Sequence, residues 1–206
     1  MSNLVESKLK KYPLLTRYAQ SGLVNFNALA RLFGNDKGRA AVGMKLRRYI
    51  SGLPKTSLVP FDFTKYHLQL VTRTNIQEMI LDKSLNNRKI CLDVINTISR
   101  TKYFVSVVEG EREIVLMTDY PLKKLFNKGR FKSVISYLTN DLSFISVNFP
   151  VEMRQVPGIY SLVTSSLADA NISIHSFHTI GGEILILVKN KDLLKSHEVL
   201  KSLLFD

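Results

Sequence analysis

An internal repeat restricts the fold of this 206-residue chain more than any other feature of its sequence. Two stretches, residues 103–124 and 173–194, share one order: a strand, a turn containing Gly and Glu, a second apolar strand and a helix. Glu113-Ile114 in the first stretch matches Glu183-Ile184 in the second and sets their alignment. The sequence therefore predicts two copies of one supersecondary unit.

Each copy is preceded by a further strand and an amphipathic helix. Residues 76–81 and 144–149 are the predicted strands. The helical faces are Cys91, Val94, Ile95 and Ile98 in the first copy, and Ile159, Leu162, Val163, Leu167 and Ala170 in the second. Each unit is an α+β arrangement with its helices on one face of a sheet. An extra strand over residues 66–71 is expected to complete one of the two sheets.

The N-terminal part predicts short helices instead. Pro13 suits the first turn of a helix that ends at Ser21-Gly22, and Asn25 suits the N-cap of a second helix. Asn35-Asp36 then forms a tight turn and opens a third helix that runs to about residue 51. Two helices joined by a tight turn form the helix-turn-helix pattern.

Positive charge is concentrated in the same part of the chain. The formal net charge is +12, and the first 60 residues carry 11 Lys and Arg against two acidic residues, so they hold +9 of it. This asymmetry favours a dedicated head that binds a polyanion, although a solvated basic surface is the alternative. We therefore expect an all-α (winged-)helix-turn-helix-like domain over residues 1–55, followed by a linker over residues 56–65.

The third predicted helix has two distinct faces. Its apolar stripe would pack on the core of the head and consists of Val42, Leu46, Tyr49 and Ile50. The opposite side combines small residues, which allow close approach to a groove, with cations that reach phosphates or guanine. The predicted double-stranded-DNA-binding residues are Lys37, Arg39, Ala40, Ala41, Met44, Lys45, Arg47 and Arg48, with Arg39 and Lys45 as phosphate contacts or plain surface.

The second repeat resembles a known regulatory module. Residues 156–174, VPGIYSLVTSSLADANISI, resemble the amino-acid-binding ACT domain, and are most similar to the tandem ACT pair that regulates aspartate kinases. Residues 71–75 and 145–147 resemble the same module, and the likeness extends over roughly residues 66–206. It implies two ferredoxin-like ACT units, residues 66–141 and 142–206. Asn86-Asn87-Arg88 stands in the first unit where Pro-Gly would be, which puts a ligand site there in doubt.

The resemblance also implies where an amino acid would bind. Pro157-Gly158 stands at a strand-to-helix junction, where unpaired backbone N–H groups and the positive helix end can hold a carboxylate. The implied ligand residues are Met153, Arg154, Gln155, Val156, Pro157, Gly158, Ile159, Tyr160, Asn171, Ile172 and Ser173. Alternatively, Pro-Gly merely makes a tight turn, Asn171 caps a helix end in the left-handed conformation, and Tyr160 covers the sheet edge.

The sequence does not support other classes of protein. The sequence has no phosphate-binding, nucleophile-elbow or HExxH motif, so we expect no catalytic residues, metal or cofactor. His175 and His178 are expected on opposite faces of one strand, and Cys91 is expected to be a buried, inert thiol. With a single cysteine and no membrane-spanning or signal segment, a cytoplasmic protein without membrane contact is expected.

These features together predict a transcriptional regulator. An amino-acid effector at the ACT pair would change the spacing of two DNA-binding heads in a homodimer or higher homo-oligomer. The alternative is a non-catalytic regulatory subunit that senses an amino acid and binds a metabolic enzyme, with the head as a docking module.

Overall fold

The computed structural model describes Ser7, Leu9 and residues 12–33, 39–54, 63–123 and 135–205. The chain divides into two compact units, Met1–Phe61 and Asp62–Asp206. This division falls within the segment expected to be a linker.

The N-terminal unit is built from the helices α2 (Pro13–Gln20), α3 (Phe26–Phe33) and α4 (Arg39–Ser51). The side chain of Asn25 accepts hydrogen bonds from the backbone N–H groups of Asn27 and Ala28, as its predicted capping role requires. The apolar stripe of α4 lies in the core as predicted, with Leu46 and Ile50 buried. The predicted turn at Asn35-Asp36 lies outside the described residues, so the helix-turn-helix assignment stays a prediction.

The C-terminal unit is an α+β structure with one six-stranded antiparallel sheet. Its strands are β1 (Gln69–Asp82), β2 (Val105–Glu109), β3 (Glu113–Thr118), β4 (Ile135–Asn148), β5 (Ser176–Ile180) and β6 (Glu183–Lys189), in the order β2-β3-β1-β4-β6-β5. β3 and β6 begin at Glu113 and Glu183, which confirms the alignment of the repeat. The two sheets expected from the sequence are joined into one, and the extra strand is the first half of β1.

The long strands β1 and β4 each serve both repeats. They pair with each other over most of their length, whereas β3 pairs only with residues 77–82 of β1 and β6 only with residues 142–148 of β4. The pairing shifts beside Asn75 and Asp141, whose φ angles are 61° and 64°. Each strand passes from one repeat into the other at this bulge, so the boundary expected between residues 141 and 142 lies inside β4.

Helices cover the outer face of both halves of the sheet. α5 (Leu85–Ile98) packs on Met79, Leu81, Ile114 and Leu116, while α7 (Ile159–Asp169) and α8 (Leu193–Phe205) cover the other half. The short 3-10 turns are η2 (Phe63–Lys65), η3 (Val151–Gln155) and η4 (Asn190–Asp192). The helix expected at the end of the first repeat falls mainly on residues outside the described part.

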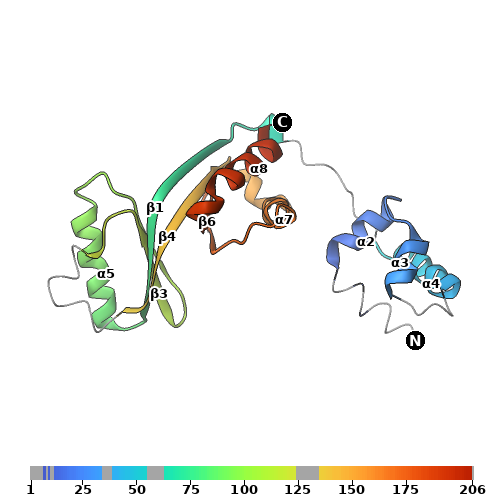
Figure 1. The fold of residues 1–206 in the computed structure, drawn as a ribbon, viewed down its shortest axis with the longest axis horizontal. Coiled ribbons are helices and arrows are strands. Elements are labelled where there is room, and N and C mark those ends of the chain that lie inside the picture. Colours follow the sequence, from blue (N-terminus) through green and yellow to red (C-terminus); the bar gives the residue numbers. More distant parts are fainter. Residues whose placement is uncertain are drawn as a thin grey trace. The chain divides into compact units, whose positions relative to one another are not determined.

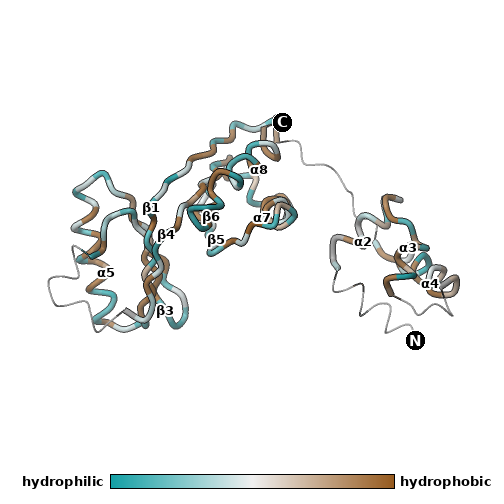
Figure 2. Tube along the Cα trace, in the orientation of Figure 1, coloured by the Kyte–Doolittle hydropathy of each residue, from teal (hydrophilic) through white to brown (hydrophobic). Residues whose placement is uncertain are grey.

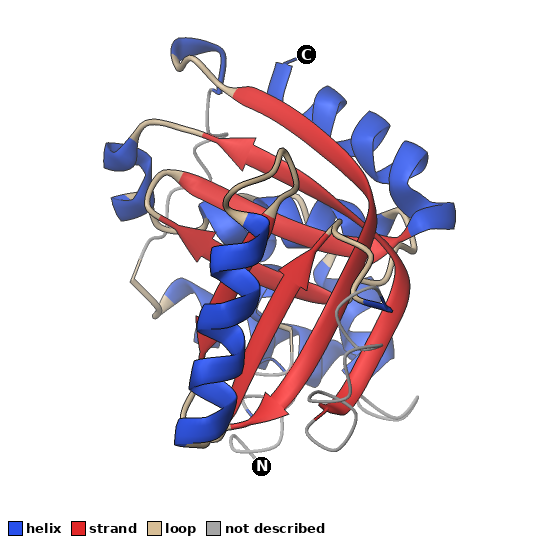
Figure 3. Cartoon of the chain, turned by 90° about the vertical axis from the view of Figure 1, so that its left-hand side faces the viewer, coloured by secondary structure: helices blue, strands red, loops and turns tan. Residues whose placement is uncertain are grey.

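The opposite, inner face of the sheet forms a core of its own. Its buried residues are Ile76, Met117, Leu142, Phe144, Leu185 and Leu187. The sheet bends so that its two halves face each other, with α5 on one outer side and α7 and α8 on the other (Figures 1 and 3). Apolar segments of β1, β3 and β4 run together in this region (Figure 2). Burial of both faces explains why β3 and β6 read as nearly continuous apolar runs.

Candidate ligand site and basic helix

The chain passes from β4 to α7 through a short loop that ends at Gly158. After η3, Val156 is extended and Gly158 becomes the N-cap of α7 with φ 95°, a conformation that glycine adopts easily and other residues rarely do. No side chain caps the helix at this position. The N–H groups of the first turn, at Tyr160 and Ser161, have no acceptor within the helix. The loop therefore presents backbone donors at the positive end of a helix dipole.

The corresponding junction in the first repeat is closed. Ser84 Oγ accepts a hydrogen bond from the backbone N of Asn87 at 3.1 Å, and Asn87 Nδ2 donates to the carbonyl of Asp82 at 2.7 Å. The neighbouring cations Lys83 and Arg88 both pair with Glu109. Hydrogen bonds from Arg88 and then Lys83 hold the pKa of Glu109 below its usual value. The first turn of α5 thus has a side-chain cap at Asn87, and the two cations beside it are paired with Glu109.

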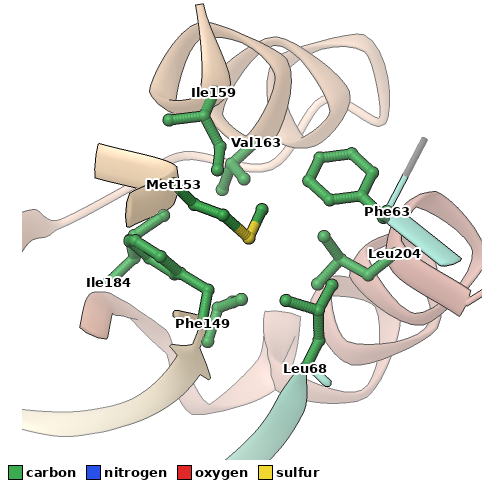
Figure 4. A pocket seen from close by; sticks show the side chains of 9 residues that line it. Phe63, Leu68, Phe149, Met153, Ile159, Val163, Ile184 and Leu204 are labelled. Atoms are coloured by element: carbon green, nitrogen blue, oxygen red, sulfur yellow. The ribbon is translucent and has the colours of Figure 1, made fainter. Parts of the chain in front are cut away.

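The side chains of the predicted site residues point in different directions. Met153 and Ile159 are buried and point into an apolar core with Phe63, Phe149 and Leu204, where no water-sized cavity remains (Figure 4). Only the backbone of these two residues can face a ligand. By contrast, Arg154, Gln155 and Pro157 are exposed, while Val156, Gly158 and Tyr160 are half-buried.

Asn171, Ile172 and Ser173 lie at the other end of α7. Because α7 has 11 residues, this end lies about 16 Å from Gly158. Asn171 has φ 58°, and the N–H groups of Asn171 and Ile172 donate to Ala168 and Leu167 at 2.8 and 2.9 Å. This is the left-handed helix ending considered for Asn171 from the sequence. Within one chain the predicted residues therefore form two groups at opposite ends of a helix.

Two contacts fix the loop against the sheet. The ring of Tyr160 meets Phe177 of β5 edge-on, with centroids 6.1 Å apart, so Tyr160 does cover the edge strand. A Cβ on Gly182 would lie 2.3 Å from the carbonyl oxygen of Phe149. Phe149 in turn donates its N–H to Gly182 at 2.8 Å. Sequence reasoning assigned Gly182 only to a turn and missed this close approach, which places the start of the loop.

A polar cluster on the inner face was also missed. The side chain of Glu78 is 6% exposed, and its carboxylate lies 2.7 Å from Nε2 of His175, at hydrogen-bonding distance. This contact joins β1 to the segment before β5. The expectation that His175 and His178 lie on opposite faces was wrong, because His175 precedes the strand and both histidines lie near Glu78. Burial lowers the pKa of His178, an effect that Glu78 partly offsets. Within the described residues, Thr139 Oγ1, Ser176 Oγ and His178 Nε2 are buried without a hydrogen-bond partner.

The basic face of α4 is exposed where it is described. The exposed members of the predicted set are Ala40, Ala41, Met44, Lys45, Arg47 and Arg48. Lys37 and the side chain of Arg39 lie outside the described residues. The guanidinium of Arg47 lies 5.3 Å from the centre of the Phe26 ring, so α3 holds this cation in place. This contact was not predicted from the sequence.

Other features bear on the chemistry of the chain. Cys91 is buried on α5, as expected, and burial raises the pKa of its thiol. No group of three metal-binding side chains occurs in the part of the chain that the structure describes. In the same part, no helix has the length and apolar character needed to cross a membrane.

The architecture of the C-terminal unit is that of the ACT-type regulatory domains of aspartate kinases. The regulatory subunit of aspartate kinase from Thermus thermophilus superposes with a TM-score of 0.52 at 10% identity, over 65% of this chain and 94% of that chain. A putative C-terminal regulatory domain of aspartate kinase from Porphyromonas gingivalis gives 0.50 at 16% identity, over 68% and 99%. These likenesses confirm the ACT-type fold expected from residues 156–174.

Whole aspartate kinases match over the same kind of region. The enzyme from Clostridium acetobutylicum superposes with a TM-score of 0.52 at 13% identity, over 66% of this chain and 34% of that chain. The present chain thus spans about a third of that enzyme. No protein-family model matches the sequence, and no similar curated protein was found.

Proposed function

We propose that this protein is an amino-acid sensor whose effector places its carboxylate at the N-terminus of α7. The observation that carries the proposal is the contrast between the two repeats. Gly158 gives the first turn of α7 no side-chain cap, whereas the Ser84 side chain caps the equivalent turn of α5. A free amino acid offers the anion that such a turn binds. The ACT-type fold supports the same ligand class.

Substitutions of Gly158 test this proposal. Asn and Asp tolerate positive φ better than other side chains, have nearly the same shape and differ in charge. Gly158→Asp should repel a carboxylate ligand and Gly158→Asn should not, so the Asp variant should bind at least about tenfold more weakly than the Asn variant. A thermal-shift screen of the wild-type protein with the common amino acids identifies the effector, and titration calorimetry compares the variants. Equal affinity of both variants would remove the helix terminus from the site.

We further propose that the N-terminal helical head binds double-stranded DNA through α4. It is supported by the charge of the first 60 residues and by the exposed cations Lys45, Arg47 and Arg48. Phe26 holds the Arg47 guanidinium in a fixed position, which suits a bidentate contact with a guanine edge. Two heads in a homodimer, or a higher homo-oligomer, would read two half-sites at a spacing that the bound effector changes.

A matched pair of double variants tests the head. Arg47→Ala with Arg48→Ala should weaken DNA binding at least about tenfold and reduce its dependence on salt. Lys89→Ala with Lys102→Ala removes the same charge from exposed positions in the C-terminal unit and should leave binding unchanged. Fluorescence anisotropy with DNA from the region upstream of the protein's own coding sequence measures both. Equal losses would indicate nonspecific attraction by net charge.

The second candidate function is a regulatory subunit of an amino-acid-pathway enzyme. It is favoured by the match to the regulatory subunit of the Thermus thermophilus aspartate kinase, nearly all of which this chain covers. In that case the effector screen would succeed while the DNA assay showed only weak binding, equal for both double variants. The two assays together therefore separate the two functions.

A further inference from the structure

One edge of the sheet is left without a partner strand. β3 pairs with β1 only over residues 77–82, so the outer edge of residues 69–74 meets no strand among the described residues. This edge carries no charge from Gln69 to Thr72, and Val71 is 46% exposed. Exposed edges are normally protected by charge, proline or a covering element, because they pair readily with another chain.

α8 lies beside this edge and has an exposed stripe of its own. Leu68, Leu70 and Val71 line an open hollow together with His197, Lys201 and Phe205 of α8. Four residues at helical spacing, Leu194, Glu198, Lys201 and Phe205, are exposed along the helix. Leu194 is 71% exposed and Phe205 is 44% exposed. In an isolated copy, the apolar surface of both side chains is therefore in contact with water.

The order of residues in this stripe is self-complementary. Two copies of α8 related by a twofold axis at its middle, between residues 199 and 200, would run antiparallel. Leu194 of one copy then lies opposite Phe205 of the other, and Glu198 lies opposite Lys201. The apolar ends meet and the opposite charges meet, twice each, as an isologous contact requires.

We propose that a second copy of this chain covers this surface, with β1 pairing antiparallel to β1 of the partner and α8 packing against its counterpart. The 13 residues of α8 and the six-residue edge both extend about 20 Å, so one twofold axis can serve both layers. The proposal rests on the homodimer invoked for the regulator and names its surface. It requires neither DNA nor an amino acid.

A charge-swap cycle tests the reciprocal pair. Glu198→Lys alone and Lys201→Glu alone should each weaken the dimer at least about tenfold, because two attractive pairs become two repulsive ones. The double variant reverses both pairs and should restore the dimer. Sedimentation velocity over a range of protein concentrations measures the dissociation constant, and circular dichroism confirms that each variant is folded. A double variant as weak as the single variants would overturn the proposal.

A second measurement does not depend on charge. Leu194→Cys with Phe205→Cys should give disulfide-linked dimers under mild oxidation, whereas Leu85→Cys with Phe205→Cys should not, although Leu85 is 74% exposed. Equal crosslinking of both variants would reject the antiparallel register. A wild-type chain that stays monomeric at every concentration would contradict both this interface and the homodimer proposed for the regulator. A dimer whose stability is unchanged by all these substitutions would reject the interface through α8 and β1 but not the homodimer itself.

Discussion

Removing the carboxylate of Glu78 should destabilise the C-terminal unit more than any exposed substitution. Glu78 lies on the inner face with a side chain 6% exposed, and its partner His175 retains 25% exposure. Removing one partner of a buried hydrogen bond to a charged group typically costs about 1.5–3 kcal/mol, and the burial of Glu78 places the expected cost of Glu78→Ala near the upper limit, about 3 kcal/mol. The cost arises because a polar group stays buried without its partner.

The structure also supplies an apolar version of the same contact. Phe144 stands three residues after the bulge at Asp141, as Glu78 does after Asn75, and Phe104 precedes β2 as His175 precedes β5. The rings of Phe104 and Phe144 lie 4.8 Å apart. Replacing Glu78 with Leu and His175 with Phe should therefore return the free energy of unfolding to within about 1 kcal/mol of the wild-type value.

Urea unfolding followed by circular dichroism measures these free energies, and constant m-values show that the unfolded state is unchanged. Glu113→Ala, at an exposed position in β3, is the control and should cost no more than about 0.5 kcal/mol. A loss below about 1 kcal/mol for Glu78→Ala would refute the reasoning, since burial would then carry no penalty. A double variant that loses as much stability as Glu78→Ala would show that an apolar pair cannot replace the polar one.

Gly158→Ala should lower the free energy of unfolding by about 1 kcal/mol because of its positive φ, and the melting temperature measures this. Asn171→Gly should be nearly neutral while Asn171→Val costs about 1–2 kcal/mol, as denaturant titration would show. Burial lowers the pKa of His178, so its contribution to stability is fully present above pH 6.5 and is lost as the pH falls through the folded pKa. The free energies of unfolding at pH 7.5 and pH 5.5 should therefore differ less in His178→Gln than in the wild-type protein. Cys91 should react with a thiol reagent only as fast as the protein unfolds, and rapid labelling of the native protein would contradict its burial.

Periodicity and turn residues predicted the helices, the register of the repeat and the left-handed residue after α7, because these depend on local sequence. The sharing of β1 and β4 between repeats escaped prediction, since strand pairing is set by contacts between residues far apart in the chain. Nothing adjacent in sequence marks Asn75 or Asp141 as a bulge. The contact between Glu78 and His175 was not predicted for the same reason, because the two residues are 97 positions apart in the chain.

The difference between the two helix starts was only partly visible beforehand. Asn86-Asn87-Arg88 showed that the first repeat departs from the ACT pattern, but the capping bond to Ser84 required the structure. The predicted ligand residues included Met153 and Ile159 because the resemblance covers the whole loop. Their side chains serve the core, since an apolar residue beside a tight turn packs inward as readily as it meets a ligand.

The exchange of strands between the repeats has a mechanical consequence. A fragment that holds only residues 135–206 would lack the strand of β1 that borders its half of the sheet, so neither repeat is a detachable module. A force applied at the loop before α7 reaches β4 directly, and β4 is hydrogen-bonded along its length to β1. The N-terminal helices join the rest of the chain through the segment that leads to η2 and then to β1, so a pull on these helices reaches η2 first and next a strand that serves both repeats.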